Sequence, residues 1–222
     1  MYDLKSPTVK LPRRTNACAA EGCRGECRSW SRYCTRHARR MQKTRDPNGR
    51  VFSPKELKAY REMAADHLIR KRNHPAVLAA SRYMHTCLTS PALPAAVQTE
   101  MRRLYGEGAE PLEMLLRFLA VFGLMHFNAH AIGRDVVATF NLGRAVLLTV
   151  PMGKRVSTSG REYSYGLNAR VCESYGQILR DNLGLFAAQF WDDVEKTIHG
   201  PALASQALKK ALEDVPMSED VR

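Results

Sequence analysis

The chain has 222 residues, of which 45% are hydrophobic and 25% charged. This composition is normal for a globular protein, and the length suffices for a small module plus one ordinary domain. No uninterrupted apolar run reaches 18 residues, and the first residues lack the apolar core of a signal peptide, so the sequence predicts neither a membrane helix nor export. We expect a protein of a reducing, cytoplasmic compartment.

The positive charge is concentrated in one third of the chain. The net charge is +12, and all of it lies in residues 1–75, which hold 19 Lys and Arg against 7 Asp and Glu. The 15 basic and 15 acidic residues of 76–222 cancel. A block this basic indicates a polyanionic partner. We expect that partner to be nucleic acid, either DNA or RNA, and not a membrane.

Residues 1–16 are polar and basic and are predicted to form a flexible arm, followed by a compact Cys/His module over 17–50. Four of the six cysteines fall within 17 residues, and in a chain without an export signal such clustering favours a metal over disulfides. Zinc prefers thiolate and imidazole ligands supplied as two close pairs. The ligand pairs predicted here are Cys18 with Cys23 and Cys34 with His37, and Cys27 stays open as an alternative ligand.

Three short stretches of this module carry a resemblance to a known family. They are Cys18-Ala-Ala-Glu-Gly-Cys23, Tyr33-Cys34-Thr-Arg-His37-Ala-Arg-Arg40 and Arg45-Asp46-Pro47-Asn48-Gly49. Together they resemble a small zinc-binding module of phage and mobile-element proteins, often found near HNH-type endonucleases or helix-turn-helix DNA binders. The resemblance covers the N-terminal segment only. It implies a protein of that origin, located in the bacterial host cell if phage-encoded. Cys27, and Arg45 where a glycine is usual, depart from the pattern.

The basic residues of the arm and the module are the predicted nucleic-acid contacts. Four of them recur at helical spacing after the second ligand pair and are expected to form one ridge, as phosphate binding requires. Trp30 and Tyr33 are candidates either for stacking on bases or for covering the metal site. The predicted contacts are Arg13, Arg14, Arg28, Arg32, Arg36, Arg39, Arg40, Lys43 and Arg45.

Residues 51–215 are predicted to form a mainly helical domain, and 216–222 a polar tail. Ser53, Pro54 and Glu56 form a helix start with a capping box. The predicted helices cover about 53–71, 75–88, 94–105, 111–130, a stretch to 142, 168–183, 185–198 and 202–212. A β-hairpin or small three-stranded sheet is expected over 145–167, with 145–150 as a strand. The expected fold class is mainly α, an N-terminal zinc module followed by a helical domain with a small β-hairpin.

Catalytic motifs are weak in this sequence. The one Asp-His pair, Asp66-His67, suggests an HNH-like nuclease, but it lies in a helical pattern where that site needs a hairpin. His126 and His130 lack the glutamate of a zinc protease and are expected to be buried and hydrogen-bonded. The leading hypothesis is therefore a non-enzymatic, zinc-containing nucleic-acid-binding protein. The alternative is an interaction adaptor, an inhibitor or a subunit of a larger nucleoprotein complex, with a protein partner bound through the helical domain.

Overall fold

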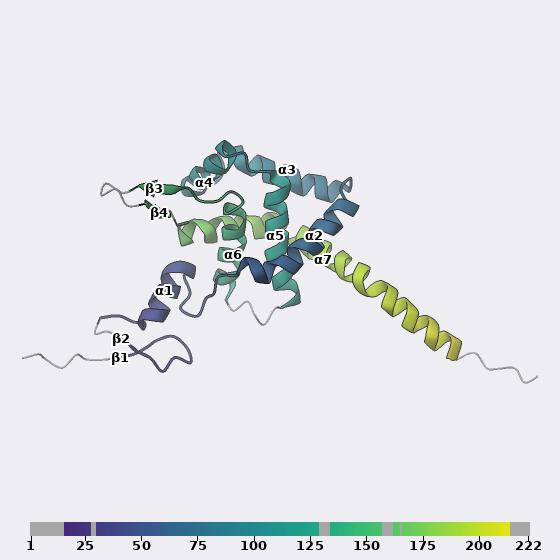
Figure 1. Ribbon diagram of the computed structural model, residues 1–222, viewed down its shortest axis with the longest axis horizontal. Coiled ribbons are helices and arrows are strands. Elements are labelled where there is room, and N and C mark those ends of the chain that lie inside the picture. Colours follow the sequence, from purple (N-terminus) through teal and green to yellow (C-terminus); the bar gives the residue numbers. More distant parts are fainter. Residues whose placement is uncertain (1–15, 28–29, 129–133, 157–161, 165, 214–222) are drawn as a thin grey trace, which may run out of the picture.

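The computed structural model describes residues 16–27, 30–128, 134–156, 162–164 and 166–213. This part of the chain is mainly helical with two short antiparallel hairpins, which confirms the expected fold class (Figure 1). The elements are β1 (Asn16–Ala17), β2 (Glu26–Cys27), α1 (Thr35–Thr44), α2 (Pro54–Arg70), α3 (Pro75–Thr89), α4 (Ala95–Gly106), α5 (Pro111–Phe127), α6 (Asp135–Leu147), β3 (Lys154–Val156), β4 (Glu162–Ser164) and α7 (Ala169–Glu213).

The first helix of the bundle, α2, begins where the capping residues predict. The Ser53 side chain accepts the backbone N–H of Glu56 at 3.3 Å, and the Glu56 carboxylate accepts the backbone N–H of Ser53 at 2.8 Å. Pro54 occupies the first turn, where its missing N–H removes no intrahelical bond. Ala64 and Leu68 face the core, whereas Ile69 is 68% exposed because it points away from the packed face.

Helix α5 is the centre of the helical domain. It packs against α2, α3, α6 and α7, and its middle turn, Phe118 to Val121, is buried on all sides. Trp191 of α7 lies against Gly123 of α5, and its indole N–H donates to the carbonyl oxygen of Leu119 at 3.0 Å. The bulky ring therefore fits because Gly123 carries no side chain, and its polar atom is satisfied.

Helices α6 and α7 make the closest contact between two helices of the domain. A Cβ atom added to Gly143 would overlap the carbonyl oxygen of Cys172, and one added to Gly176 would overlap that of Thr139. The two backbones therefore touch across a pair of glycines. Cys172 is buried in this contact and Cys87 elsewhere in the core, as expected of packing residues.

The strand predicted over 145–150 is wrong. Ala145, Val146 and Leu147 complete α6, and Val146 and Leu147 are fully buried. A short apolar run of this kind fits a buried helix as well as a strand, and here packing against α7 decides for the helix. The observed hairpin lies later in the chain and has two strands, with Arg155 opposite Tyr163.

The breaks predicted near residues 184 and 200 are also wrong, because α7 is one helix of 45 residues. Leu179, Leu183 and Ala187 are buried on one face and continue the apolar stripe past Gly184. That packing outweighs the cost of one glycine in a helix, about 1 kcal/mol. The final turns extend away from the body of the molecule (Figure 1).

None of the described helices is both long enough and apolar enough to cross a membrane.

Candidate metal centre and basic helix face

Four potential metal ligands come together at the start of α1. Cys18 and Cys23 lie on the loop of the β1–β2 hairpin, whose turn places Gly22 at φ +69°, a backbone conformation that glycine adopts without strain. Cys34 caps the N-terminus of α1, and His37 follows one turn later. The ligand atoms of these four residues all lie within 4.8 Å of one another, close enough to hold one metal ion.

The spacing of these atoms fits a tetrahedral ion. The Cys23 and Cys34 sulfurs are 3.9 Å apart, and His37 Nδ1 lies 3.4 Å from the Cys18 sulfur and 3.3 Å from that of Cys34. Tetrahedral zinc with Zn–S bonds of about 2.3 Å and Zn–N bonds of about 2.0 Å separates two sulfurs by about 3.8 Å and a sulfur from a nitrogen by about 3.5 Å. Four protein ligands leave no open position, as in structural zinc sites.

Backbone N–H groups support the sulfur ligands. The N–H of Gly25 donates to the Cys23 sulfur at 3.3 Å, and that of Cys34 donates to the Cys18 sulfur at 3.3 Å. Burial raises the pKa of the Cys18 thiol. The hydrogen bonds from Cys34 and its other neighbours lower that pKa by more, and the resulting value is about 6. Cys18 is therefore largely a thiolate at neutral pH, the form that binds metal.

Cys27 lies beside this cluster and outside it. It is on β2, buried to 1% exposure, and packs with Cys18 and Ala20 in the small core of the module. Burial and the neighbouring thiolates raise the pKa of Cys27. The Cys27 sulfur is not one of the four ligand atoms that lie within 4.8 Å of one another, so Cys27 is a core residue next to the four grouped ligands.

The ridge of basic residues lies on the open face of α1. Arg36, Arg39, Arg40 and Lys43 are all exposed. At 3.6 residues per turn they share an arc of about 100°. The buried side of the helix lies roughly a quarter turn away and faces the metal site and the rest of the protein through His37 and Thr44.

The other predicted contacts are placed differently. Arg45 forms an ion pair of 3.0 Å with Glu173 of α7, and Arg32 lies over the ring of Tyr33 with its guanidinium carbon 5.8 Å from the ring centre. Arg13, Arg14 and Arg28 lie outside the described residues. Tyr33 packs against the metal-site core, whereas Trp30 is 99% exposed. Trp30 is thus the aromatic side chain available for stacking.

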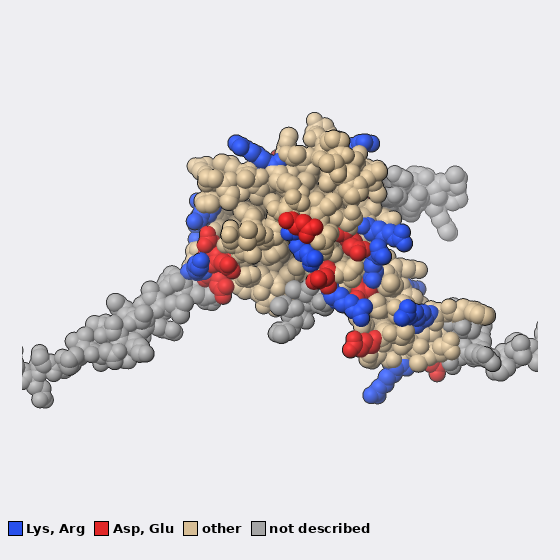
Figure 2. Space-filling model, turned by 180° about the vertical axis from the view of Figure 1, so that it is seen from behind, with Lys and Arg blue, Asp and Glu red and all other residues tan. Residues whose placement is uncertain are grey.

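One face of the body of the molecule carries charges of both signs. Figure 2 shows Lys and Arg next to Asp and Glu on that face, without a single-sign surface. Charged residues of the helical domain form ion pairs, for example Arg117 with Glu113 at 2.7 Å. The basic ridge of α1 forms no ion pair with the acidic residues that the structure describes, and it therefore differs from the charge on this face of the bundle.

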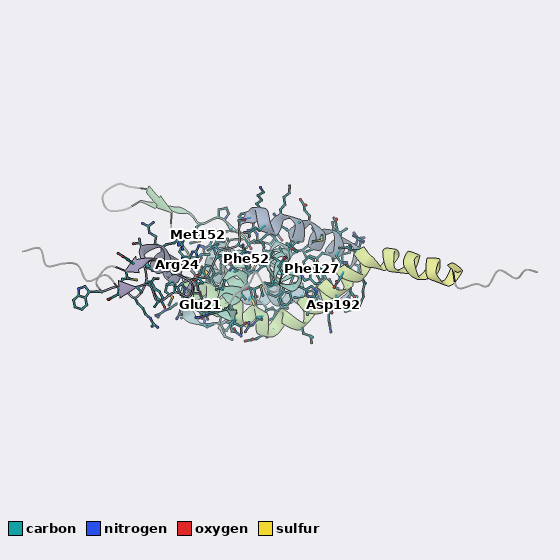
Figure 3. The ribbon with its side chains drawn as sticks, turned by 90° about the horizontal axis from the view of Figure 1, so that it is seen from below. Glu21, Arg24, Phe52, Phe127, Met152 and Asp192 are labelled. Carbon is teal, nitrogen blue, oxygen red and sulfur yellow. The ribbon has the colours of Figure 1, made fainter. Side chains whose placement is uncertain are left out.

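The module is attached to the helical domain by contacts that the sequence did not indicate. Asn141 of α6 accepts the backbone N–H of Phe52 at 2.9 Å and donates to the carbonyl oxygen of Arg50 at 2.9 Å. In Figure 3, Phe52 lies between the module, marked by Glu21 and Arg24, and the far end of the bundle. Asn141 is an ordinary polar residue in the sequence of α6, and only its burial reveals this role.

Arg45 has an unusual backbone conformation for a residue with a side chain. Its φ of 59° lies in the left-handed region, and its N–H caps α1 by donating to the Met41 carbonyl oxygen at 3.0 Å. A glycine is favoured at such a C-cap. The ion pair of Arg45 with Glu173 offers a compensating contact between the module and α7.

The Asp-His pair does not form a nuclease-like site. Asp66 and His67 lie on α2, not on a hairpin. His67 is buried with its ring edge-to-face on Phe190 at 4.8 Å between centres, while Asp66 is exposed. The two side chains therefore point to different surroundings and do not share one catalytic pocket.

His126 is only half-buried, contrary to expectation, and His130 lies outside the described residues. The Nε2 atom of His126 is 3.7 Å from a carboxylate oxygen of Asp192 and 3.9 Å from one of Glu195. These three groups are close enough to hold a cation. Both carboxylates are about half exposed, and they lie at the end of the bundle opposite the module (Figure 3).

Comparisons with protein-family models, with curated proteins and with solved structures found no match to this chain. The chemistry of the described residues is therefore the basis for assigning a function.

Proposed function

We propose that this chain is a zinc-containing, non-enzymatic nucleic-acid-binding protein of the phage or mobile-element type. The observation that carries the proposal is the arrangement on α1. One side of this helix supplies His37 to a closed Cys₃His cluster, and its open face presents Arg36, Arg39, Arg40 and Lys43 without acidic partners among the described residues.

Zinc is the metal that best suits the cluster. Three thiolates and one imidazole at tetrahedral spacing are the ligands of structural zinc sites. The module around them has a core of only a few small residues, so metal binding would supply much of its folding free energy. All six cysteines are free thiols, which suits a reducing compartment such as the cytoplasm of a bacterial host.

The metal assignment is tested by elemental analysis and by cobalt substitution. We expect one zinc per chain in protein purified without added metal. Replacing it with Co²⁺ gives the visible absorption bands of a tetrahedral ion with thiolate ligands. Iron as the bound metal, or a stoichiometry well below one in folded protein, contradicts the proposal.

Nucleic acid is the polyanion that best suits the ridge. Cations at successive turns of one helix face can reach several phosphates, and each neutralised phosphate makes binding more sensitive to salt. The fully exposed Trp30, earlier in the same module, is available to stack on a base. The ridge predicts phosphate binding and does not specify a base sequence.

The binding proposal is tested by titrating the zinc-loaded protein with labelled duplex DNA, single-stranded DNA and RNA at several salt concentrations. Changing Arg36, Arg39 and Arg40 together to Ala is expected to weaken binding roughly 100-fold and to reduce the salt slope by about 2 to 3. A matched control replaces the exposed Arg70, Lys71 and Arg72, at the end of α2, with Ala. Equal losses in the two triple variants, or no binding at low salt, contradict the proposal.

A further inference from the structure

A groove lies in the helical domain, far along the chain from the metal cluster. Its volume is about 820 Å³, and it is bounded by α2, α5 and α6. Helices α2 and α6 both pack on α5 but scarcely touch each other, so the groove runs between them with α5 as its floor. Its wall on α2 extends from Pro54 to Ala65, roughly 16 Å at a rise of 1.5 Å per residue.

The floor of the groove is apolar. Leu116, Ala120 and Val121 line it from α5, Leu57 from α2, and Ala145 with Leu148 from α6 and the turn after it. Leu57, Leu116 and Leu148 keep part of their surface exposed. An apolar slot between two helices that rest on a third is the surface that an amphipathic helix covers when it binds.

The rim of the groove is basic. Lys55, Lys58, Arg61, Arg117 and Arg144 line it, against one acidic lining residue, Glu62. A carboxylate oxygen of Glu62 lies 3.8 Å from the Lys58 Nζ atom, and Glu113 forms ion pairs with both Arg61 and Arg117. The charge left over after these pairs is positive, so the groove complements an acidic ligand.

Arg144 is the most informative of these cations. It is half-buried on α6, and no acidic side chain in the described ranges forms an ion pair with it. Burial lowers the pKa of its guanidinium, since a charge removed from water without a carboxylate partner is disfavoured. A ligand carboxylate at this position would supply the missing charge at the edge of an apolar floor.

We propose that this groove docks one acidic amphipathic helix of a partner protein. The apolar side of that helix covers the exposed parts of Leu57, Leu116 and Leu148, and its carboxylates meet Lys55 and Arg144. Nucleic acid fits this groove less well, because a phosphate backbone has no apolar face to match the floor. The inference does not depend on the nucleic-acid proposal, which concerns a different surface of the chain.

The experiment selects ligands for the full-length, zinc-loaded protein from a displayed library of 16-residue helices. Each helix has Leu on one face and random charged residues, Glu or Lys, on the others. We expect the selected helices to be rich in Glu. A fluorescein-labelled winner is expected to bind at least ten-fold more tightly than the same sequence with Lys in place of Glu, as measured by fluorescence anisotropy.

Variants then locate the binding surface. Arg144→Gln and Lys55→Gln are each expected to weaken binding three-fold or more, and Ala145→Trp, which fills the groove, ten-fold or more. Arg102→Gln on α4 removes an exposed cation outside the groove and is expected to change nothing. Thermal unfolding followed by circular dichroism establishes that each variant is folded.

Four outcomes would overturn the proposal. They are selection of basic or uncharged helices, binding that survives both Arg144→Gln and Ala145→Trp, displacement of the helix by duplex DNA, and a homodimer in sedimentation that Arg144→Gln dissociates. The third outcome would assign the groove to nucleic acid, and the fourth to a second copy of this chain. Loss of DNA binding in the Arg36, Arg39 and Arg40 variant, with helix binding retained, separates this inference from the proposed function.

Discussion

Asn141 and Phe52 are joined by a buried hydrogen bond of 2.9 Å between the amide oxygen of the first and the backbone N–H of the second, 89 residues apart. The same side chain donates to the carbonyl oxygen of Arg50 at 2.9 Å. One residue of α6 therefore satisfies two backbone polar groups of the segment that leaves the Cys/His module.

We predict that Asn141→Ala destabilises the protein by about 2–4 kcal/mol, because it leaves the buried N–H of Phe52 and the partly buried carbonyl oxygen of Arg50 without this partner. Urea unfolding followed by circular dichroism measures this change. Asn182→Ala is the matched control, since Asn182 is exposed and donates to the carbonyl oxygen of Ile178 in its own helix. Equal effects of the two substitutions would mean that Asn141 does not hold the linker.

Substitution by alanine is expected to have opposite effects on stability at Gly143 and at Gly184. Gly143→Ala places a methyl group against the Cys172 carbonyl, part of a rigid helix backbone, and is expected to destabilise the fold by about 2–4 kcal/mol. Gly184→Ala meets only the flexible Arg180 side chain at 3.8 Å and is expected to stabilise the fold by about 0.5–1 kcal/mol. Thermal or urea unfolding of both variants gives the sign of each change. A neutral Gly143→Ala would contradict the close approach of α6 and α7.

Substitutions at Cys34 and Cys27 distinguish a proposed metal ligand from a cysteine of the core. Cys34→Ser is expected to abolish stoichiometric zinc binding, although serine is a favourable residue at its N-cap position and should preserve the start of α1. Cys27→Ala is expected to retain one zinc per chain and to lower only the stability of the module. Metal analysis after gel filtration measures both. Loss of zinc in the Cys27 variant alone would mean that Cys27 is the metal ligand and Cys34 is not.

His67 predicts a pH dependence of stability. Burial lowers the pKa of its imidazole, and the charge of Lys71 adds to this effect. The unfolded chain, in which a histidine has a pKa of about 6.5, therefore binds this proton at a higher pH than the folded chain does. The contribution of the neutral His67 to the free energy of unfolding is fully present above pH about 6.5. It decreases as the pH falls below that value.

The measurement is the free energy of unfolding between pH 7.5 and 5, for the wild type and for His67→Gln. The variant is expected to lose less stability over this range than the wild type, while His85→Gln, an exposed histidine on α3, should behave as the wild type does. Parallel curves for all three proteins would show that His67 does not titrate on unfolding. Comparison between variants cancels the contribution of the metal site, which is common to all.

Local chemistry determined much of this protein from the sequence alone. The capping box at Ser53 and Glu56 places the start of α2, and the prolines at 75 and 111 place those of α3 and α5, because each acts on the first turn of its own helix. The grouping of Cys18, Cys23, Cys34 and His37 follows from short spacings that tight turns can close. The exposed ridge on α1 follows from helical periodicity.

Tertiary packing decided the rest. The apolar run 145–150 is helical at its start, and α7 continues through Gly184, because the faces they bury against other helices outweigh their local preferences. The contact of Gly143 with α7, the bonds of Asn141 to Arg50 and Phe52, and the groove between α2 and α6 each join residues far apart in the chain. Sequence patterns indicate which residues share one face of a helix or strand. They do not indicate which other element packs against that face, because that is decided only when the chain folds.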